Sequence, residues 1–105
     1  LAYSAAKGGI RSMTKSIAVH CRAKKYRIRC NSIHPGSIST PMVHAALEAT
    51  VGLKIMDAAD PEATRLALGI GEPDDVANMV VFLASDESKH ITGAELVIDN
   101  GDTVV

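Results

Sequence analysis

Residues 26–36 read YRIRCNSIHPG, a segment in which polar and apolar residues partly alternate before a proline and a glycine. Such a segment, stopped abruptly by turn residues, is typical of a strand that runs into a turn. We expect a strand over residues 26–33 and a turn at residues 34–36. The turn then lies at the carboxyl end of the strand.

A long helix is predicted before this strand. Apolar residues recur at three- and four-residue steps through residues 3–24, as they do on one face of a helix. The residues expected to face the core are Ile10, Met13, Ile17 and Cys21. The same apolar stripe would also suit a contact between subunits, so both kinds of burial stay open for Ile10, Met13 and Ile17.

A second helix and a second strand are predicted near the end of the chain. Proline and acidic residues at 72–75 mark a helix start, and the apolar pattern continues to about Ser85. Residues 95–99 read ELVID, a nearly continuous apolar run of the kind found in strands covered on both faces. Asn100 and Gly101 close this strand. Between Ser37 and Gly71 the signals are weaker, and we expect a long functional loop with short helices.

The order helix, strand, long loop, helix, strand predicts an α/β fold with a parallel sheet and right-handed crossovers. Two such strands would leave ladder edges and apolar helix faces exposed. We therefore expect residues 1–105 to be the carboxyl-terminal part of a larger subunit.

Tyr3 and Lys7 stand four residues apart in the opening LAYSAAKGG. On a helix this spacing points both side chains the same way. An ammonium beside a phenol stabilises the phenolate form, so the pair can serve as a proton-transfer device. Tyrosine and lysine also recur at this spacing by chance, so the pair alone does not establish a site. The small residues around it, including Gly8 and Gly9, indicate that something approaches this helix closely.

Composition and charge exclude several classes of protein. The chain has 105 residues, 47% of them hydrophobic, and a formal net charge of −1, as expected of a globular protein without a nucleic-acid or membrane partner. The basic run over residues 22–29 falls at the expected helix end, where cations complement the helix dipole. No apolar stretch reaches the ~20 residues of a membrane span, and we expect a cytoplasmic protein.

The cysteines and histidines predict no protein-ligated metal. Cys21 and Cys30 are not spaced as in a zinc or redox motif, and we expect two reduced, largely buried thiols. The histidines are scattered, with no short repeated spacing to one another or to a cysteine.

Four segments together resemble the carboxyl-terminal half of the short-chain dehydrogenase/reductases, NAD(P)-dependent oxidoreductases with a single Rossmann-type, doubly wound parallel sheet. The segments are YSAAKGG at 3–9, IRCNSIHPG at 28–36, SISTPM at 37–42, and FLASDES at 82–88 followed by ITGAELVID at 91–99. The resemblance covers essentially all 105 residues, with similarity to secondary-alcohol and hydroxysteroid dehydrogenase members.

The resemblance implies catalytic roles for Tyr3 and Lys7. The family tyrosine exchanges a proton with the substrate oxygen, while a hydride passes between the carbinol carbon and nicotinamide. The family lysine also hydrogen-bonds the nicotinamide ribose. The implied reaction interconverts a secondary alcohol and a ketone, as in a ketoreductase, with NAD or NADP as cofactor.

The resemblance also implies a cofactor-binding segment. Tyr3 and Lys7 would be joined by Pro35, Gly36, Ser37, Ile38 and Thr40. Ile38 would meet the nicotinamide carboxamide through backbone groups, and Thr40 would hydrogen-bond nearby. Such a site agrees with the tendency of open α/β sheets to bind ligands beyond the carboxyl ends of strands. By itself, Pro35-Gly36 better suits an ordinary turn at the end of a strand, and only Thr40 and the Tyr3/Lys7 pair favour a cofactor site there.

The loop over about 42–71 should cover the substrate, and its apolar residues suggest an apolar secondary alcohol, alicyclic or steroid-like. Its simpler interpretation is a helical lid packed on the body. In the family, the first long helix and the last helix and strand build the contacts of homodimers and homotetramers. Residues 1–105 can therefore alternatively serve chiefly as an assembly module, or belong to a non-catalytic regulatory homologue. The family's glycine-rich loop, catalytic serine and helix asparagine would precede Leu1. Asn100 and Cys30 replace a common glycine and a common valine, and we expect little disruption from either.

Overall fold

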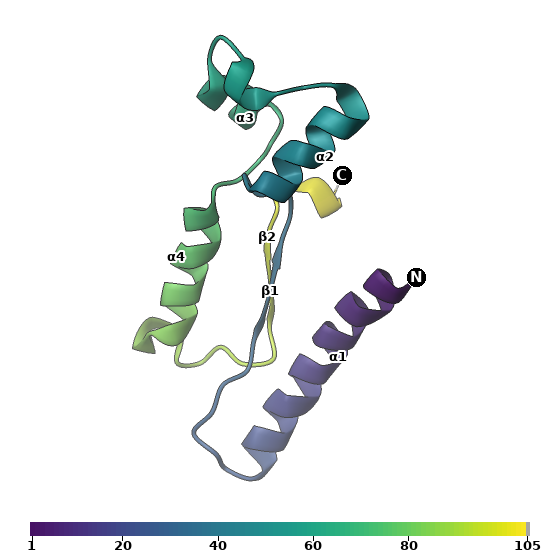
Figure 1. Ribbon diagram of the computed structural model, residues 1–105. Helices are drawn as coiled ribbons and strands as arrows, with labels where there is room; N and C mark the ends of the chain where they lie inside the picture. Colours follow the sequence, from purple (N-terminus) through teal and green to yellow (C-terminus); the bar gives the residue numbers. More distant parts are fainter. Residues whose placement is uncertain (105) are drawn as a thin grey trace. The chain divides into compact units, whose positions relative to one another are not determined.

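The computed structural model describes residues 1–104. One long helix precedes the first of two short strands, and three further α-helices lie between the two strands (Figure 1). In order, the elements are α1 (Ala2–Ala23), β1 (Ser32–Pro35), α2 (Pro41–Val51), a 3-10 turn (Ile55–Asp57), α3 (Pro61–Ala67), α4 (Pro73–Ala84), a 3-10 turn (Asp86–Ser88), β2 (Glu95–Ile98) and a last 3-10 turn (Asp102–Val104).

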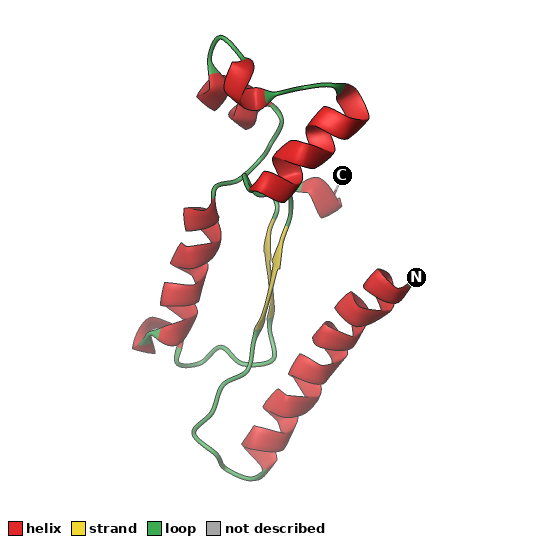
Figure 2. Ribbon diagram, in the orientation of Figure 1, coloured by secondary structure: helices red, strands yellow, loops and turns green. Residues whose placement is uncertain are grey.

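The chain divides into two compact units, one of residues 1–34 and 79–96, the other of residues 35–78 and the segment from 97 onward. The first unit holds α1, the beginning of both strands and the end of α4. The second holds the ends of both strands, α2, α3 and the start of α4. Helices make up most of the regular structure (Figure 2). Over residues 1–104, no helix is long and apolar enough for a membrane span.

β1 and β2 pair as a two-stranded parallel sheet (Figure 1). In the first unit Ser32 donates its N–H to the Ala94 carbonyl at 3.0 Å. In the second unit Gly36 donates its N–H to the Ile98 carbonyl at 2.9 Å. The number of the acceptor rises with that of the donor, so the strands run in the same direction. The expected α/β class with a parallel sheet is confirmed.

The strand predicted over residues 26–33 begins and ends later than expected, because β1 spans Ser32–Pro35. Residues 34 and 35, which were expected in the turn, belong to the strand. The amide of Asn31 donates to the Ile91 carbonyl and accepts the Ala94 N–H, each at 3.0 Å. Cys30 donates its N–H to the Thr92 hydroxyl at 3.1 Å. These bonds to side-chain groups hold the backbone beside the loop before β2, and regular pairing starts only after them.

The long first helix is confirmed, since α1 spans Ala2–Ala23. It ends where Lys25 takes a left-handed conformation, with φ of 59°, and Tyr26 donates its N–H to the Cys21 carbonyl at 2.9 Å. A left-handed residue followed by such a backbone bond is a common helix stop.

The predicted core stripe of α1 is only partly right. Cys21 is buried, but Ile10, Met13 and Ile17 remain 42%, 57% and 40% exposed. The buried side chains of the helix are Thr14, Ala18 and Cys21. A Cβ added at Gly93 would lie 3.4 Å from the Ala18 Cβ, so small residues allow the loop before β2 to pack on this helix face. Both cysteines are free thiols, and Cys30 is half-buried.

Arg29 ties the segment before β1 to the end of α4 within the first unit. Its guanidinium donates to the Leu83 carbonyl at 2.8 Å, the Ser85 carbonyl at 3.4 Å and the Ser88 hydroxyl at 3.1 Å. Ser88 is 1% exposed. The other basic residues of the 22–29 run are exposed, as expected of a solvated helix end. The run thus contains one part-buried structural arginine that its charge pattern did not distinguish.

In the second unit, two proline positions interpreted as chain breaks are helix starts. Thr40 caps α2 by accepting the Val43 N–H at 3.4 Å, and Asp60 caps α3 by accepting the Ala63 N–H at 3.1 Å. In both helices proline occupies the first turn, where it has no carbonyl to bond. The expected long loop therefore contains two capped helices. The predicted start of α4 at Pro73 is confirmed.

The end of β1 requires glycine at position 36. A Cβ added there would lie 2.7 Å from the Asp99 Cβ and 3.0 Å from the Asp99 Cα. Asn100, which follows, has φ of 55°, a left-handed value that asparagine tolerates well. The strand ends meet so closely that the first side-chain carbon is already too large at Gly36.

We expect Arg29→Ala to lower the free energy of unfolding by about 1–3 kcal/mol, because part-buried carbonyls lose a charged donor. Arg27→Ala is the matched control, since Arg27 is exposed, and it should change stability by no more than about 0.5 kcal/mol. Chemical denaturation measures both. Equal effects of the two substitutions would contradict the structural role of Arg29.

We expect Gly36→Ala to destabilise the protein by about 1–3 kcal/mol, because the new methyl group must displace the end of β2. Gly8→Ala should instead be neutral or stabilising by up to about 1 kcal/mol, since alanine is the better helix former and an added Cβ meets no described atom within 4 Å. Chemical denaturation measures the change in the free energy of unfolding for both substitutions, and the two changes should differ in sign or in size. A neutral Gly36→Ala would show that the strand ends can separate freely.

Candidate active site

Tyr3 and Lys7 lie side by side on the first turns of α1. The Lys7 Nζ is 5.4 Å from the centroid of the Tyr3 ring, within reach of a cation–π interaction. Tyr3 is 75% exposed. Gly8 and Gly9 are exposed too, and a Cβ added at either would meet no described atom within 4 Å. The helical spacing thus places the phenol and the ammonium together on an open surface.

The segment from Pro35 to Thr40 begins at the last residue of β1 and lies in the second unit. Ile38 forms an isolated parallel bridge with Gly71. The bonds of this bridge come from its neighbours, because the Ser37 carbonyl accepts the Gly71 N–H at 2.9 Å and the Ser39 N–H donates to the Gly71 carbonyl at 2.7 Å. In such a bridge the N–H and C=O of the central residue face the opposite side. Ile38 therefore turns its own backbone donor and acceptor away from Gly71.

The remaining predicted residues of this segment differ in exposure. Pro35 and Ser37 are exposed, Gly36 and Thr40 are half-buried, and the Ile38 side chain is 9% exposed. The Thr40 oxygen accepts the Val43 N–H as the cap of α2, which leaves its hydroxyl proton able to donate. Tyr3 and Lys7 belong to the first unit, whereas residues 35–40 belong to the second. The geometry of each group is therefore defined separately, within its own unit.

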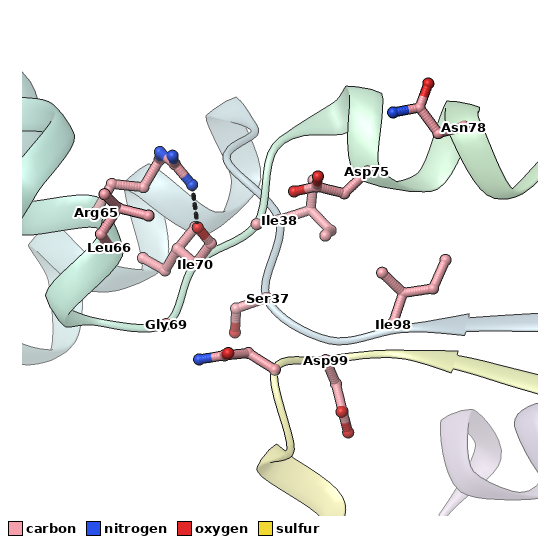
Figure 3. Close-up of a pocket in the computed structure, with 12 residues that line it drawn as sticks. Ser37, Ile38, Arg65, Leu66, Gly69, Ile70, Asp75, Asn78, Ile98 and Asp99 are labelled. Atoms are coloured by element: carbon pink, nitrogen blue, oxygen red, sulfur yellow. Dashed lines mark hydrogen bonds between the residues drawn. The ribbon is translucent and has the colours of Figure 1, made fainter.

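A cavity of about 470 Å³ adjoins this segment in the second unit (Figure 3). Ser37 and Ile38 line it together with residues that the sequence patterns did not single out as site residues: Arg65, Asp75, Asn78 and Asp99. Arg65 came from the stretch with the weakest pattern, and Asp75 was interpreted only as a helix-start acid. Arg65 lies in the last turn of α3, four residues before Gly69, which has φ of 70°, and a basic residue in a last helical turn was the one available signal for it.

Two carboxylates of this unit have lowered pKa values. Hydrogen bonding to Thr103, followed by the backbone N–H of Gly101, holds the pKa of Asp99 below its ordinary value. The pKa of Glu62 is lowered first by its hydrogen bond with Arg65. In both cases, hydrogen-bond donors from the same unit stabilise the ionised carboxylate.

A second cavity, of about 280 Å³, lies within the 42–71 segment. Ionisable residues dominate its lining, namely His44, Glu48, Lys54 and Asp57, with Ile55 and Met56. The His44 Nε2 also lies 2.9 Å from the Ser39 Oγ. Among residues 1–104, no cluster of three or more His, Cys, Asp or Glu side chains could hold a metal ion.

Comparison with known proteins places this arrangement in a family. Residues 1–103 match the family described as Enoyl-(Acyl carrier protein) reductase. The chain is 46% identical over 103 residues to the NADP-dependent (R)-specific alcohol dehydrogenase of Lentilactobacillus kefiri, covering 97% of this chain and 38% of that protein. It is 44% identical over 98 residues to a 3-beta-hydroxysteroid dehydrogenase of Comamonas testosteroni, covering 93% of this chain and 38% of that protein.

Solved structures share the fold. A C-terminal deletion mutant of the Thermoplasma acidophilum aldohexose dehydrogenase superposes with a TM-score of 0.77 at 36% identity, over 99% of this chain and 46% of that one. A short chain dehydrogenase family protein from Francisella tularensis superposes with a TM-score of 0.76 at 31% identity, over 100% of this chain and 44% of that one. The chain spans less than half the length of these relatives. Its helices and parallel strands form part of a Rossmann-type fold, and the chain belongs to the short-chain dehydrogenase/reductase family.

Proposed function

We propose that residues 1–105 are the carboxyl-terminal half of a subunit that interconverts a secondary alcohol and a ketone with NAD or NADP. The observation that carries the proposal is the pairing of Tyr3 with Lys7, whose Nζ is 5.4 Å from the phenol ring. Family membership makes hydride transfer to nicotinamide the reaction to test first. The relatives named as alcohol and hydroxysteroid dehydrogenases support this choice.

In the proposed mechanism Tyr3 exchanges a proton with the substrate oxygen. During oxidation the phenolate accepts the hydroxyl proton, and during reduction the phenol returns it. The Lys7 ammonium would stabilise the phenolate and would be placed to donate to the ribose of a bound nicotinamide cofactor. The bound nicotinamide would accept or supply the hydride at the carbinol carbon. The exposure of Tyr3 leaves its hydroxyl open to a ligand from outside the described residues.

The backbone of Ile38 fits the nicotinamide carboxamide. Its N–H and C=O face away from Gly71, and together they match the oxygen and the amino group of a primary amide. Thr40 offers a hydroxyl proton close by in sequence, while Pro35, Gly36 and Ser37 shape the turn. These residues are proposed to hold the nicotinamide end of NAD or NADP. One solved relative is described as bound to NAD and another relative is named NADP-dependent, so both cofactors are candidates.

We expect Tyr3→Phe to lower kcat by about 10²- to 10⁴-fold, because the substrate oxygen loses its proton donor. Affinity for the cofactor should stay within a fewfold of wild type, since the ring remains. Tyr26→Phe is the matched control, because Tyr26 is the other tyrosine of the chain, lies beyond α1 and is half exposed. The measurement is nicotinamide absorbance with the full-length protein, both cofactors and a panel of secondary alcohols.

Retention of wild-type turnover by Tyr3→Phe would overturn the assigned role. Folding of each variant is checked by circular dichroism, so that a collapsed protein is not mistaken for a catalytic defect. Tyr26→Phe should keep the wild-type rate. A wild type that binds cofactor but turns over no substrate would favour a non-catalytic homologue.

We propose an apolar secondary alcohol, alicyclic or steroid-like, as substrate. The segment over about 42–71 leaves apolar side chains open to contact, with Met42 78%, Val51 68% and Met56 74% exposed. Relatives named cyclopentanol dehydrogenase and 3-beta-hydroxysteroid dehydrogenase support the same class. The cavity lined by ionisable residues in this segment supports the opposite class, a polar alcohol, and a relative named L-rhamnose-1-dehydrogenase agrees with it.

We expect kcat/KM to be at least about tenfold higher for cyclic and steroidal alcohols than for sugars or hydroxy acids of similar size, because burying apolar substrate surface contributes about 25 cal/mol per Å². Competition between cyclopentanol, a hydroxysteroid, a sugar and a hydroxy acid measures the preference. A preference for the sugar or the hydroxy acid would assign the polar cavity to substrate binding instead.

An assembly module is the second candidate function. The exposed Ile10, Met13 and Ile17 form an apolar stripe on α1 that the described residues leave uncovered. In a homodimer or homotetramer such a stripe would be buried between helices. The catalytic and assembly roles are compatible, so loss of turnover in Tyr3→Phe with an unchanged oligomer would separate them.

A further inference from the structure

The backbone of Gly71 is hydrogen-bonded to both neighbours of Ile38, in the segment proposed to bind the cofactor. It donates to the Ser37 carbonyl at 2.9 Å and accepts the Ser39 N–H at 2.7 Å. These two bonds set the direction in which the peptide groups of Ile38 point. The position of Gly71 therefore controls the orientation of the segment proposed to meet nicotinamide.

Gly71 has no side chain with which to anchor itself, and an added one would require the end of the Ile38 side chain to move. A Cβ at this position would lie 2.9 Å from the Ile38 Cδ1 and 3.3 Å from the Asp75 Oδ2. The residues on either side must therefore hold it in place. Asp75 contributes by accepting the Glu72 N–H at 2.8 Å.

Arg65 contacts both neighbours of Gly71. Its Nη1 donates to the Ile70 carbonyl, as Figure 3 shows, and its Nη2 lies 3.5 Å from the Glu72 Oε1. Ile70 is 4% exposed, so its carbonyl depends on a protein donor. One guanidinium thus holds the residue before Gly71 by its backbone and the residue after it by its side chain.

The Arg65 side chain is itself held in one orientation. Glu62 accepts from its Nε at 3.2 Å and from its Nη2 at 2.6 Å, and the Arg65 side chain is only 11% exposed. The planar guanidinium fork can reach Glu62 and Ile70 together, whereas a lysine ammonium is a point charge on a flexible stem. The anchoring therefore depends on arginine geometry as well as on positive charge.

We propose that Arg65 is a positioning residue for the nicotinamide end of the cofactor, acting through Ile70 and Gly71 on the Ser37–Thr40 segment. The proposal rests on the proposed function, since the ligand of that segment is the cofactor. Arg65 does not itself touch the cofactor. Its loss loosens the backbone that presents Ile38, while the adenosine end, which binds elsewhere on the subunit, is unaffected.

The test compares two ligands that differ in the nicotinamide. The full-length protein is titrated calorimetrically with the preferred reduced cofactor and with its fragment that lacks nicotinamide, ADP-ribose or its 2′-phosphate. Arg65→Ala should raise the Kd of the reduced cofactor about tenfold, as expected for loss of one charge-assisted anchor. The Kd of the fragment should stay within about twofold. Arg65→Lys should fall between wild type and Arg65→Ala.

Arg22→Ala is the matched control, because Arg22 is an exposed arginine near the end of α1, and it should change neither Kd. If Arg65→Ala does not fold, the same titrations are made with Glu62→Ala and Arg65→Lys. Each of these substitutions disturbs the guanidinium hydrogen bonds but keeps most of the side-chain packing. Equal weakening of both ligands, or no weakening of either, would overturn the positioning role. A wild type that binds the fragment and neither reduced cofactor would overturn the proposed function, and the role of Arg65 with it.

Discussion

At the carboxyl ends of β1 and β2, Gly36 donates its N–H to the Ile98 carbonyl at 2.9 Å, and the chain leaves no room for a side chain at Gly36. The segment that follows β1 in the second unit starts at this close contact, which therefore fixes where the segment begins. The chain after Gly36 bonds next to Gly71, then caps α2 with Thr40. A parallel pair with glycine at its end can thus deliver backbone groups to a ligand without a side chain in the way.

The bridge between Ile38 and Gly71 also depends on a closely packed glycine. Two glycines, Gly36 and Gly71, hold the segment that contains Ile38, and each is packed against a neighbour that a methyl group would strike. Because glycine cannot anchor itself, polar side chains from the surrounding helices supply the anchors. Arg65, Glu62 and Asp75 do so with charged hydrogen bonds, which are stronger than neutral ones. The geometry of the segment therefore depends on residues that lie outside it in the sequence.

Several features could be predicted from sequence because they depend on neighbours along the chain. The helical spacing of Tyr3 and Lys7, the helix start at Pro73 and the left-handed Asn100 are of this kind. The start of β1 could not, because it depends on the Asn31 amide reaching two backbone groups more than 59 residues away in sequence. The burial of Thr14 and Ala18 in place of Ile10 and Met13 likewise depends on which loop packs on α1.

Local pattern was thus enough to establish the α/β class, the long helix, the Tyr3–Lys7 pair and the resemblance to the family. It indicated a strand ending in a turn near Gly36, but it placed both too early, since residues 34 and 35 belong to β1. The roles of Arg29 and Arg65 emerged only on folding, since each donates to carbonyls whose positions are set by packing. An arginine in the sequence shows its charge, but its partners are chosen by the three-dimensional path of the backbone.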